Sequence, residues 1–172
     1  MLVMDELIVV LDNIRSTHNV GSILRTADGL GVIKVFLTGY TPYPRVINDK
    51  RLPHEITRQT NAIKKTSLGA ETTMNIERHE KIDEVIDSLK KVNYTIVSLE
   101  QNKLSTPINQ LKIPGKVALI VGNEVDGVNN HTLGSSDFIA EIPMKGKKES
   151  FNVSVATGIA LYELSYRGNY EI

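Results

Sequence analysis

The chain has 172 residues, 41% of them hydrophobic, which suits one domain with a single filled core. Basic and acidic residues number 20 each, so the chain lacks the basic excess of many nonspecific nucleic-acid binders. The absence of cysteine excludes disulfides, thiolate zinc sites, iron–sulfur clusters and cysteine nucleophiles. Four histidines, at 18, 54, 79 and 131, lack metal-like spacing, so we expect no metal site. Residues 1–6 lack a basic leader and no apolar run is of membrane-spanning length, so we expect a cytoplasmic protein that contacts no membrane.

Five short apolar runs, rich in β-branched residues and bounded by turn residues, predict strands. They are Leu7 to Leu11, Val32 to Leu37, Tyr94 to Leu99, Val117 to Val121 and Phe138 to Ile142. Apolar residues recur with helical spacing in segments 20–30, 82–89 and 153–164. Continuous apolar strands alternating with helices indicate an α/β domain: a mostly parallel sheet with helices on both faces.

Basic residues gather locally although the total charge is zero. One group lies in or after a proline-containing stretch, 41–51, that predicts an ordered surface loop. The two groups are Arg45, Lys50, Arg51, Arg58, Lys64 and Lys65, and Lys145, Lys147 and Lys148. They indicate either a positive face or ordinary solvated surface charge.

Three segments combine glycines with polar residues beside strand or helix ends: 13–31, 117–128 and 142–163. None is a phosphate loop or a dinucleotide-binding fingerprint. In open α/β sheets, ligands bind beyond the carboxyl ends of the strands. We therefore expect the three segments to meet at one small-molecule site.

The first segment predicts a helix with Asn19 as its N-cap. Gly21 and Arg25 share one face of this helix, and side chains lean toward the helix N-terminus. Arg25 would then lie across Gly21, whose missing side chain leaves room for an anion beside the helix dipole. The alternative is a surface arginine that pairs with Asp28.

In the second segment, Gly122 follows a strand and lets the chain turn, which presents Asn123 and Glu124 at the rim of the sheet. A single glutamate does not identify an acid or a base, and an ordinary solvated loop is the alternative.

The third segment ends a strand at Ile142 and Pro143, continues through a basic loop, and opens a helix at Ser150 and Asn152. The backbone groups freed there would read a purine edge, with Met144 and Phe151 against the ring. Small residues follow in the helix at Ala156, Gly158 and Ala160, which either admit another backbone or simply pack well. Gly158 is costly inside a helix, by up to about 1 kcal/mol relative to alanine, and so requires a reason.

The three segments resemble the motifs of a known family. N-V-G-S-I-L-R-T-A, I-V-G-N-E-V-D-G and I-P-M-K-G-K-K-E-S-F-N-V-S-V-A are similar to the three motifs of the SpoU (TrmH) RNA ribose 2′-O-methyltransferases of the SPOUT superfamily. The resemblance extends from about Leu7 to Arg167. It implies a C-terminal trefoil knot, S-adenosyl-L-methionine as cofactor, and a homodimer with the site near the subunit interface. It also implies transfer or ribosomal RNA as partner. We expect one domain, 1–172, without the separate RNA-binding domain that many relatives carry.

Residue roles carried over from the family fall on matching positions. The catalytic positions are Arg25, Asn19, Glu124, Ser150 and Asn152. The cofactor contacts, largely through backbone groups, are Ser98, Leu99, Gly122, Ile142, Met144 and Phe151. Phe151 replaces the leucine more usual in the family. As RNA contacts we expect Arg45, Arg51, Arg58, Lys64, Lys65 and Lys147.

The resemblance implies in-line attack of a ribose 2′-hydroxyl on the sulfonium methyl. Arg25 is the family's proposed base, but a guanidinium is effectively never deprotonated in proteins. We favour Arg25 as a phosphate ligand that stabilises the developing oxyanion. Two alternatives stay open: a catalytically silent RNA-binding module of the same fold, and a SPOUT methyltransferase that modifies a base.

Overall fold

The structure, a computed structural model, describes residues 6–113 and 115–166. The opening residues before Glu6 and the expected limit of the resemblance at Arg167 lie outside the described residues. Seven strands form one sheet in the order β3-β2-β1-β6-β4-β7-β5. Their bounds are β1 (Leu7–Asp12), β2 (Lys34–Thr38), β3 (Ile76–Arg78), β4 (Thr95–Leu99), β5 (Thr106–Pro107), β6 (Val117–Val121) and β7 (Phe138–Glu141).

All pairings between these strands are parallel, which confirms the expected sheet type. The helices are α1 (Thr17–Gly29), α2 (Pro53–Ser67), α3 (Ala70–Thr73), α4 (Ile82–Lys91), α5 (Asn130–Ser135) and α6 (Val153–Tyr166), with a 3₁₀ turn, η1 (Ile108–Gln110). In the part of the chain that is described, no helix combines the length and the apolar character needed to cross a bilayer.

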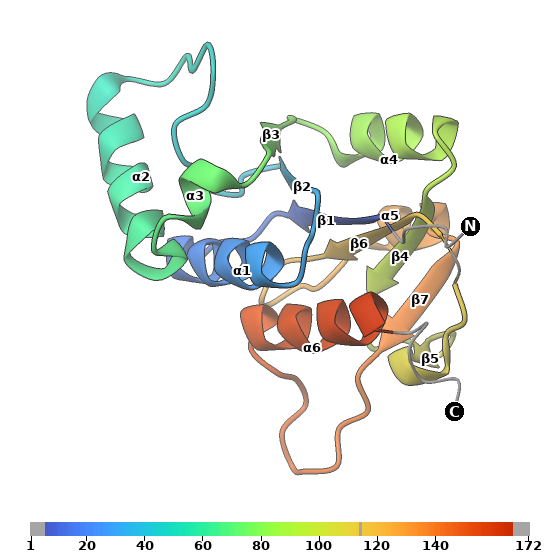
Figure 1. The fold of residues 1–172 in the computed structure, drawn as a ribbon. Helices are drawn as coiled ribbons and strands as arrows, with labels where there is room; N and C mark the ends of the chain where they lie inside the picture. Colours follow the sequence, from blue (N-terminus) through green and yellow to red (C-terminus); the bar gives the residue numbers. More distant parts are fainter. Residues whose placement is uncertain (1–5, 114, 167–172) are drawn as a thin grey trace.

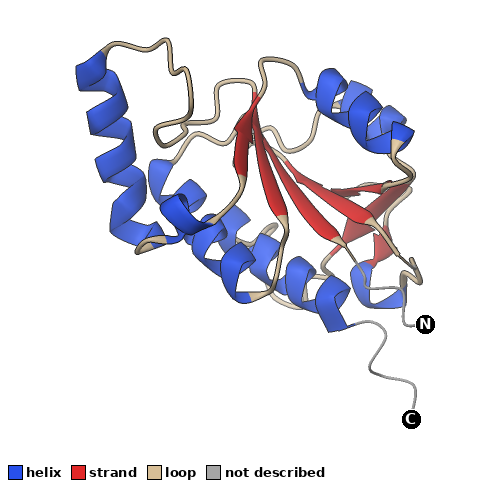
Figure 2. Ribbon diagram, turned by 45° about the horizontal axis from the view of Figure 1, so that its top comes forward, coloured by secondary structure: helices blue, strands red, loops and turns tan. Residues whose placement is uncertain are grey.

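Alternating residues of the central strands divide the core into two parts. In β1, Ile8 and Val10 pack with the apolar face of α4, whereas Val9 and Leu11 pack with α1 and α6. Figure 2 shows the helices on opposite faces of the twisted sheet, and Figure 1 shows α1 and α6 side by side. The expectation of a sheet covered on both faces is therefore confirmed.

Helix α2 was not expected from the sequence, because it lacks a wide apolar stripe. Only Ile56, Ile63 and Ser67 are buried in its 15 residues. It begins at Pro53, a residue that suits the first helical position, and it stands away from the sheet at one end of the molecule (Figure 1). Tertiary contact with α1, rather than its own periodicity, fixes this helix.

The contact between α1 and α2 explains Gly21. A Cβ added at Gly21 would lie 2.1 Å from Thr66 Oγ1 and 2.4 Å from Ile63 O, both in α2. Thr66 Oγ1 also donates to His18 O at 2.9 Å. The missing side chain therefore lets two helices touch and does not clear space for a ligand, which corrects the expectation from the sequence.

Candidate active site

A cavity of about 400 Å³ lies at the carboxyl ends of β4, β6 and β7 and at the start of α6. This is the place where parallel α/β sheets bind ligands. Its walls come from three loops and are apolar and acidic: Leu99, Glu100, Gln101, Val121, Gly122, Asn123, Glu124, Val125, Asp126, Gly127, Glu141, Ile142, Glu149, Ser150, Phe151, Val153 and Ala156. The second and third sequence segments therefore meet, as expected.

The loop after β6, residues 122–128, is folded tightly on itself. A Cβ at Gly122 would lie 2.5 Å from the carbonyl carbon of Gly127, so the two glycines allow a close backbone contact. Asn123 Oδ1 accepts the backbone N–H groups of Val125 (2.7 Å) and Asp126 (3.0 Å). Asn123 Nδ2 donates to Asn13 O (3.1 Å) and to the hydroxyl of Tyr40. The loop is thus fixed internally and tied to the loops after β1 and β2.

Glu124 binds the N-terminus of α1. Its carboxylate accepts the backbone N–H groups of Arg15 (2.9 Å) and Ser16 (3.2 Å) and the side-chain amide of Asn19 (2.9 Å). Burial raises the pKa of Glu124, but the hydrogen bonds from Arg15, Asn19 and Ser16 outweigh it and hold the pKa below its ordinary value. Glu124 is therefore an ionised anchor, and a carboxylate of this chain already lies where an external anion was expected.

The helix cap also differs from the expectation. Ser16, not Asn19, is the N-cap of α1, and its Oγ accepts the backbone N–H of Asn19 at 3.3 Å. This frees the Asn19 side chain to link two segments: its Nδ2 donates to Glu124, and its Oδ1 accepts from Asn152 Nδ2 at 3.3 Å. Asn152 Oδ1 in turn accepts the N–H of Ser154 (2.9 Å) at the start of α6. Three predicted catalytic positions therefore form one chain of contacts beside the cavity.

Arg25 lies elsewhere within a single chain. It is exposed and lines a separate groove of about 860 Å³ between α1, α2 and α6, together with Ser22, Lys65, Gly158 and Glu163. Among the described residues, its side chain makes no hydrogen bond or ion pair, and Asp28 accepts instead from Thr73 Oγ1 at 3.4 Å. The start of the first segment therefore meets the other two beside the cavity through Asn19, whereas one protomer alone does not bring Arg25 there, which corrects the expectation for Arg25.

The predicted cofactor residues divide into two groups. Leu99, Gly122, Ile142 and Phe151 line the cavity, and so does Ser150 of the predicted catalytic set. Ser98 and Met144 do not: Ser98 is fully buried and its hydroxyl lies 2.7 Å from that of Ser136, after α5. Ser98 lies one position before the end of β4, and its side chain points to the opposite face of the sheet from that of Leu99, toward Ser136.

Sequence reasoning missed Glu100 as a residue of the cavity and did not assign a role to Asn123. Glu100 directly follows β4, and Asn123 comes after Gly122, the first residue beyond β6; both strands end at the site. The rule that ligands bind beyond carboxyl ends of strands contained the signal for Glu100.

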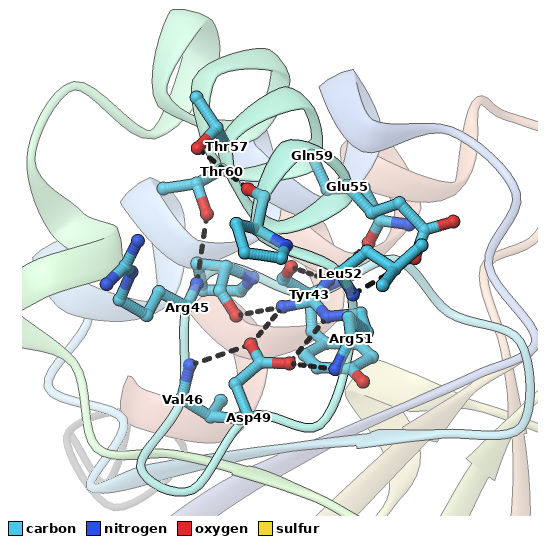
Figure 3. Close-up of polar contacts among 12 residues, drawn as sticks. Tyr43, Arg45, Val46, Asp49, Arg51, Leu52, Glu55, Thr57, Gln59 and Thr60 are labelled. Atoms are coloured by element: carbon cyan, nitrogen blue, oxygen red, sulfur yellow. Dashed lines mark hydrogen bonds and ion pairs between the residues drawn. The ribbon is translucent and has the colours of Figure 1, made fainter.

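Arg51 has a structural role (Figure 3). Its guanidinium binds Asp49 through Nε (2.9 Å) and Nη2 (2.5 Å), donates to the carbonyls of Tyr43 and Pro44, and reaches Gln59 Oε1 at 2.7 Å. It also lies 3.5 Å from the centre of the Tyr43 ring. The Arg51 side chain is 13% exposed and that of Asp49 is 5% exposed. Arg51 therefore holds the 41–52 loop to α2, which corrects its assignment as an RNA contact.

The other predicted RNA contacts have exposed side chains. They are Arg45, Arg58, Lys64, Lys65 and Lys147. Arg45 uses its backbone N–H to bind Thr60 Oγ1 in α2 (3.0 Å), which fixes its backbone position (Figure 3). As for metals, the described residues contain no cluster of three or more His, Asp or Glu side chains suited to a metal ion.

The fold and the cavity define a parallel α/β domain with a ligand pocket at a cluster of strand ends. The chain belongs to the SpoU rRNA Methylase family, whose sequence model matches residues 6–162. This confirms the family indicated by the motifs.

Named relatives agree with this assignment. The chain is 34% identical over 157 residues to a 23S rRNA (guanosine-2′-O-)-methyltransferase of Xylella fastidiosa, which covers 91% of this chain and 57% of the relative. The structure of the A. aeolicus TrmH/SpoU tRNA modifying enzyme is similar, with a TM-score of 0.79 and 28% identity over 96% of this chain and 76% of that one. An AdoMet-bound rRNA methyltransferase from Sinorhizobium meliloti gives a TM-score of 0.77 and 25% identity over 98% and 59%. The chain thus spans less than three fifths of the length of the first relative.

Proposed function

We propose that this protein transfers a methyl group from S-adenosyl-L-methionine to a ribose 2′-hydroxyl of ribosomal or transfer RNA. The observation that carries the proposal is the cavity at the ends of β4, β6 and β7, which adjoins the contacts that link Glu124, Asn19 and Asn152. The names of the rRNA- and tRNA-modifying relatives support the same substrate class. We further propose that residues 1–172 act as one methyltransferase domain in the cytoplasm.

The cavity suits the proposed cofactor in size and chemistry. Pockets of about 300 to 1,000 Å³ hold small organic ligands, and this one has about 400 Å³. Leu99, Ile142 and Phe151, a residue that is 40% exposed, offer apolar contact to an adenine. Several carboxylates, including Glu100 and Glu141, line the same cavity and favour a ligand that carries positive charge. S-adenosylmethionine supplies a methyl group on a positively charged sulfur.

The polar residues beside the cavity would orient the ribose. Asn19 is held in place by Glu124 and contacts Asn152, while Ser150 lines the cavity itself. Their amide and hydroxyl groups offer hydrogen bonds to a sugar hydroxyl, which aligns its oxygen for in-line attack. Because Glu124 is ionised and accepts three hydrogen bonds, we assign it to positioning Asn19 rather than to proton transfer.

Arg25 would reach the reacting atoms only in a homodimer. The groove that contains Arg25 also exposes Val155 (50%), Tyr162 (48%) and Leu68 (65%), which are large apolar side chains between α2 and α6. We propose that a second copy covers this face, so that Arg25 of one protomer serves the cavity of the other. There it would bind a neighbouring phosphate and stabilise the developing oxyanion.

Two further family features belong to the proposal. The path of the last helix supports a trefoil knot near the C-terminus. The strand β7 pairs with β4, which β6 separates from β1, and α6 then returns to pack on α1.

RNA would be held by exposed basic side chains of α2, of the loop before it and of the loop between β7 and α6, namely Arg45, Arg58, Lys64, Lys65 and Lys147. Binding through phosphates should weaken as salt rises.

Methyl transfer from labelled S-adenosylmethionine to ribosomal and transfer RNA tests the function. Digestion of the product to nucleosides should give a 2′-O-methylnucleoside, and the modified linkage should resist alkaline hydrolysis. A methylated base with an unmodified ribose would favour the base methyltransferase instead. RNA binding without any binding of S-adenosylhomocysteine would identify a catalytically silent module.

A further inference from the structure

Glu100 joins three walls of the cavity, although the family motifs do not include it and the proposed function uses only its charge. It directly follows β4, and its backbone N–H donates to Ala140 O in β7 at 2.8 Å. Its carboxylate Oε2 accepts the backbone N–H of Val128 at 2.8 Å, at the end of the 122–128 loop. One residue therefore ties the end of β4 to the end of β7 and to the loop after β6.

The carboxylate is seated closely against this loop. Gly127 has a φ of +69°, and a Cβ built on it would lie 2.0 Å from Glu100 Oε2. The other carboxylate oxygen, Oε1, accepts the backbone N–H of Gln101 at 2.9 Å. Both oxygens of Glu100 thus bind backbone N–H groups, and the absence of a side chain at Gly127 is what lets the carboxylate reach Val128.

The two ends of the 122–128 loop are held by different partners. Asn123 and Glu124 attach the beginning of the loop to Asn13, Arg15 and Ser16, on the β1 side of the sheet. Glu100 attaches the end of the loop, on the β4 side, where the cavity lies. Loss of the Glu100 contact would therefore loosen the wall of the cavity while the contacts of Glu124 with α1 remain.

We infer that Glu100 is a positioning residue for the methyl donor: its carboxylate binds the N–H of Val128 and so fixes the preceding residue, Gly127, as a rigid part of the wall of the donor pocket. The inference rests on the proposed function, because it concerns the same pocket. A looser wall must be ordered when the donor binds, which lowers affinity. The KM for the donor should rise by a larger factor than kcat falls.

Glu100→Gln tests this with S-adenosylhomocysteine as the probe in calorimetry. The amide nitrogen of glutamine cannot accept a hydrogen bond, so one of the two backbone contacts is lost with little change of shape. The matched variant is Glu149→Gln, which removes an equal charge from the same cavity without touching Val128. We expect the Kd to rise at least tenfold in Glu100→Gln and less than threefold in Glu149→Gln.

Equal effects of the two variants would overturn the inference in favour of simple charge attraction, and a Kd for Glu100→Gln within twofold of the wild type would also overturn it. Wild-type protein that fails to bind S-adenosylhomocysteine would instead overturn the proposed function. The amide protons of Val128 and Gln101 give a direct spectroscopic readout by NMR, because both bind the Glu100 carboxylate. At least one of the two resonances should move upfield in Glu100→Gln, and both should keep their positions in Glu149→Gln.

A double-mutant cycle guards against a general loss of structure. Gly127→Ala places a Cβ against the Glu100 carboxylate and should raise the Kd for S-adenosylhomocysteine in the wild-type background. The same substitution in a Glu100→Ala background meets no carboxylate, so its fold-effect should be clearly smaller. Fold-effects that simply multiply would show that the two residues act independently and would overturn the inference.

Discussion

Two arginines of this protein stand in opposite surroundings. Arg51 lies inside the 41–52 loop, where its guanidinium binds Asp49, Gln59 and two backbone carbonyls and stacks on Tyr43 (Figure 3). Arg25 lies exposed in the groove between α1, α2 and α6, and no described residue pairs with it. Both are basic residues in polar stretches, and the sequence assigned both to function.

The difference shows that the partners of a charge, rather than its sign, decide its role. A guanidinium with satisfied donors fixes the fold around it, since removing it would leave buried acceptors unpaired. A guanidinium with free donors contributes little to folding and remains available to a ligand or a second subunit. Substitutions at the two positions should therefore separate stability from activity.

Arg25→Ala should have the largest effect on activity. We expect kcat for methyl transfer to fall about 100- to 1,000-fold, the range found when a donor to a developing oxyanion is removed. The free energy of unfolding should change by less than about 0.5 kcal/mol, as for other exposed positions. Arg25→Lys keeps the charge and should retain part of the activity. Equal inactivity of both variants, together with a pH–rate ionisation that depends on Arg25, would favour the base role.

Arg51→Ala should show the reverse pattern. Removing Arg51 leaves Asp49, whose side chain is only 5% exposed, without its main hydrogen-bond donor, which costs about 1 to 3 kcal/mol. Arg45→Ala is the matched control in the same loop, because its side chain is exposed and its contact with Thr60 uses the backbone. Urea unfolding measures both. A loss below about 1 kcal/mol for Arg51→Ala would contradict the structural role.

The sequence predicted the parts of this protein that follow from periodicity and strand ends. The five expected strands, the helix pattern on both faces and the meeting of two motif loops all depend on local apolar spacing, and they are confirmed. Helix α2 was missed because only three of its residues are buried. The short strand β3 carries Glu77 and Arg78 at the edge of the sheet, so it lacks the apolar run that reveals a central strand.

The site was harder to predict because its side chains form hydrogen bonds with residues that are far away in the sequence. Glu124 binds Arg15 and Ser16, more than 100 positions earlier, and this pairing displaces the anion expected at α1. Gly21 appeared to make room for a ligand, whereas its space is filled by Thr66. A single sequence gives the residue types at a site but not the partners that satisfy them, and those partners distinguish an anchor from a reactive group.

The contact of Arg51 with Asp49 also predicts a pH dependence. Hydrogen bonds from the Arg51 side chain lower the pKa of Asp49 from 3.8 to about 2. Because the pKa is lowered by folding, the resulting stability is complete above about pH 4 and is lost as the pH falls toward 2. Asp49→Asn should therefore be less stable than the wild type at pH 6, and the difference should shrink as the pH falls to 2. A difference that stays constant between pH 6 and pH 2 in urea unfolding would exclude this linkage.

The smallest expected effect lies in the Arg25 groove, at Gly158. A Cβ added there would meet only a methyl group of Thr26, at an ordinary 3.5 Å. Alanine is favoured over glycine inside a helix by up to about 1 kcal/mol, so Gly158→Ala should raise the free energy of unfolding of the isolated protomer by about that amount. If a second copy covers the groove, the added methyl group should weaken dimerisation, measured by analytical ultracentrifugation, while it stabilises the fold. A variant that is more stable and associates as strongly as the wild type would place the subunit contact on another face, and Arg25 would then lack the route to the cavity that the proposed homodimer would provide.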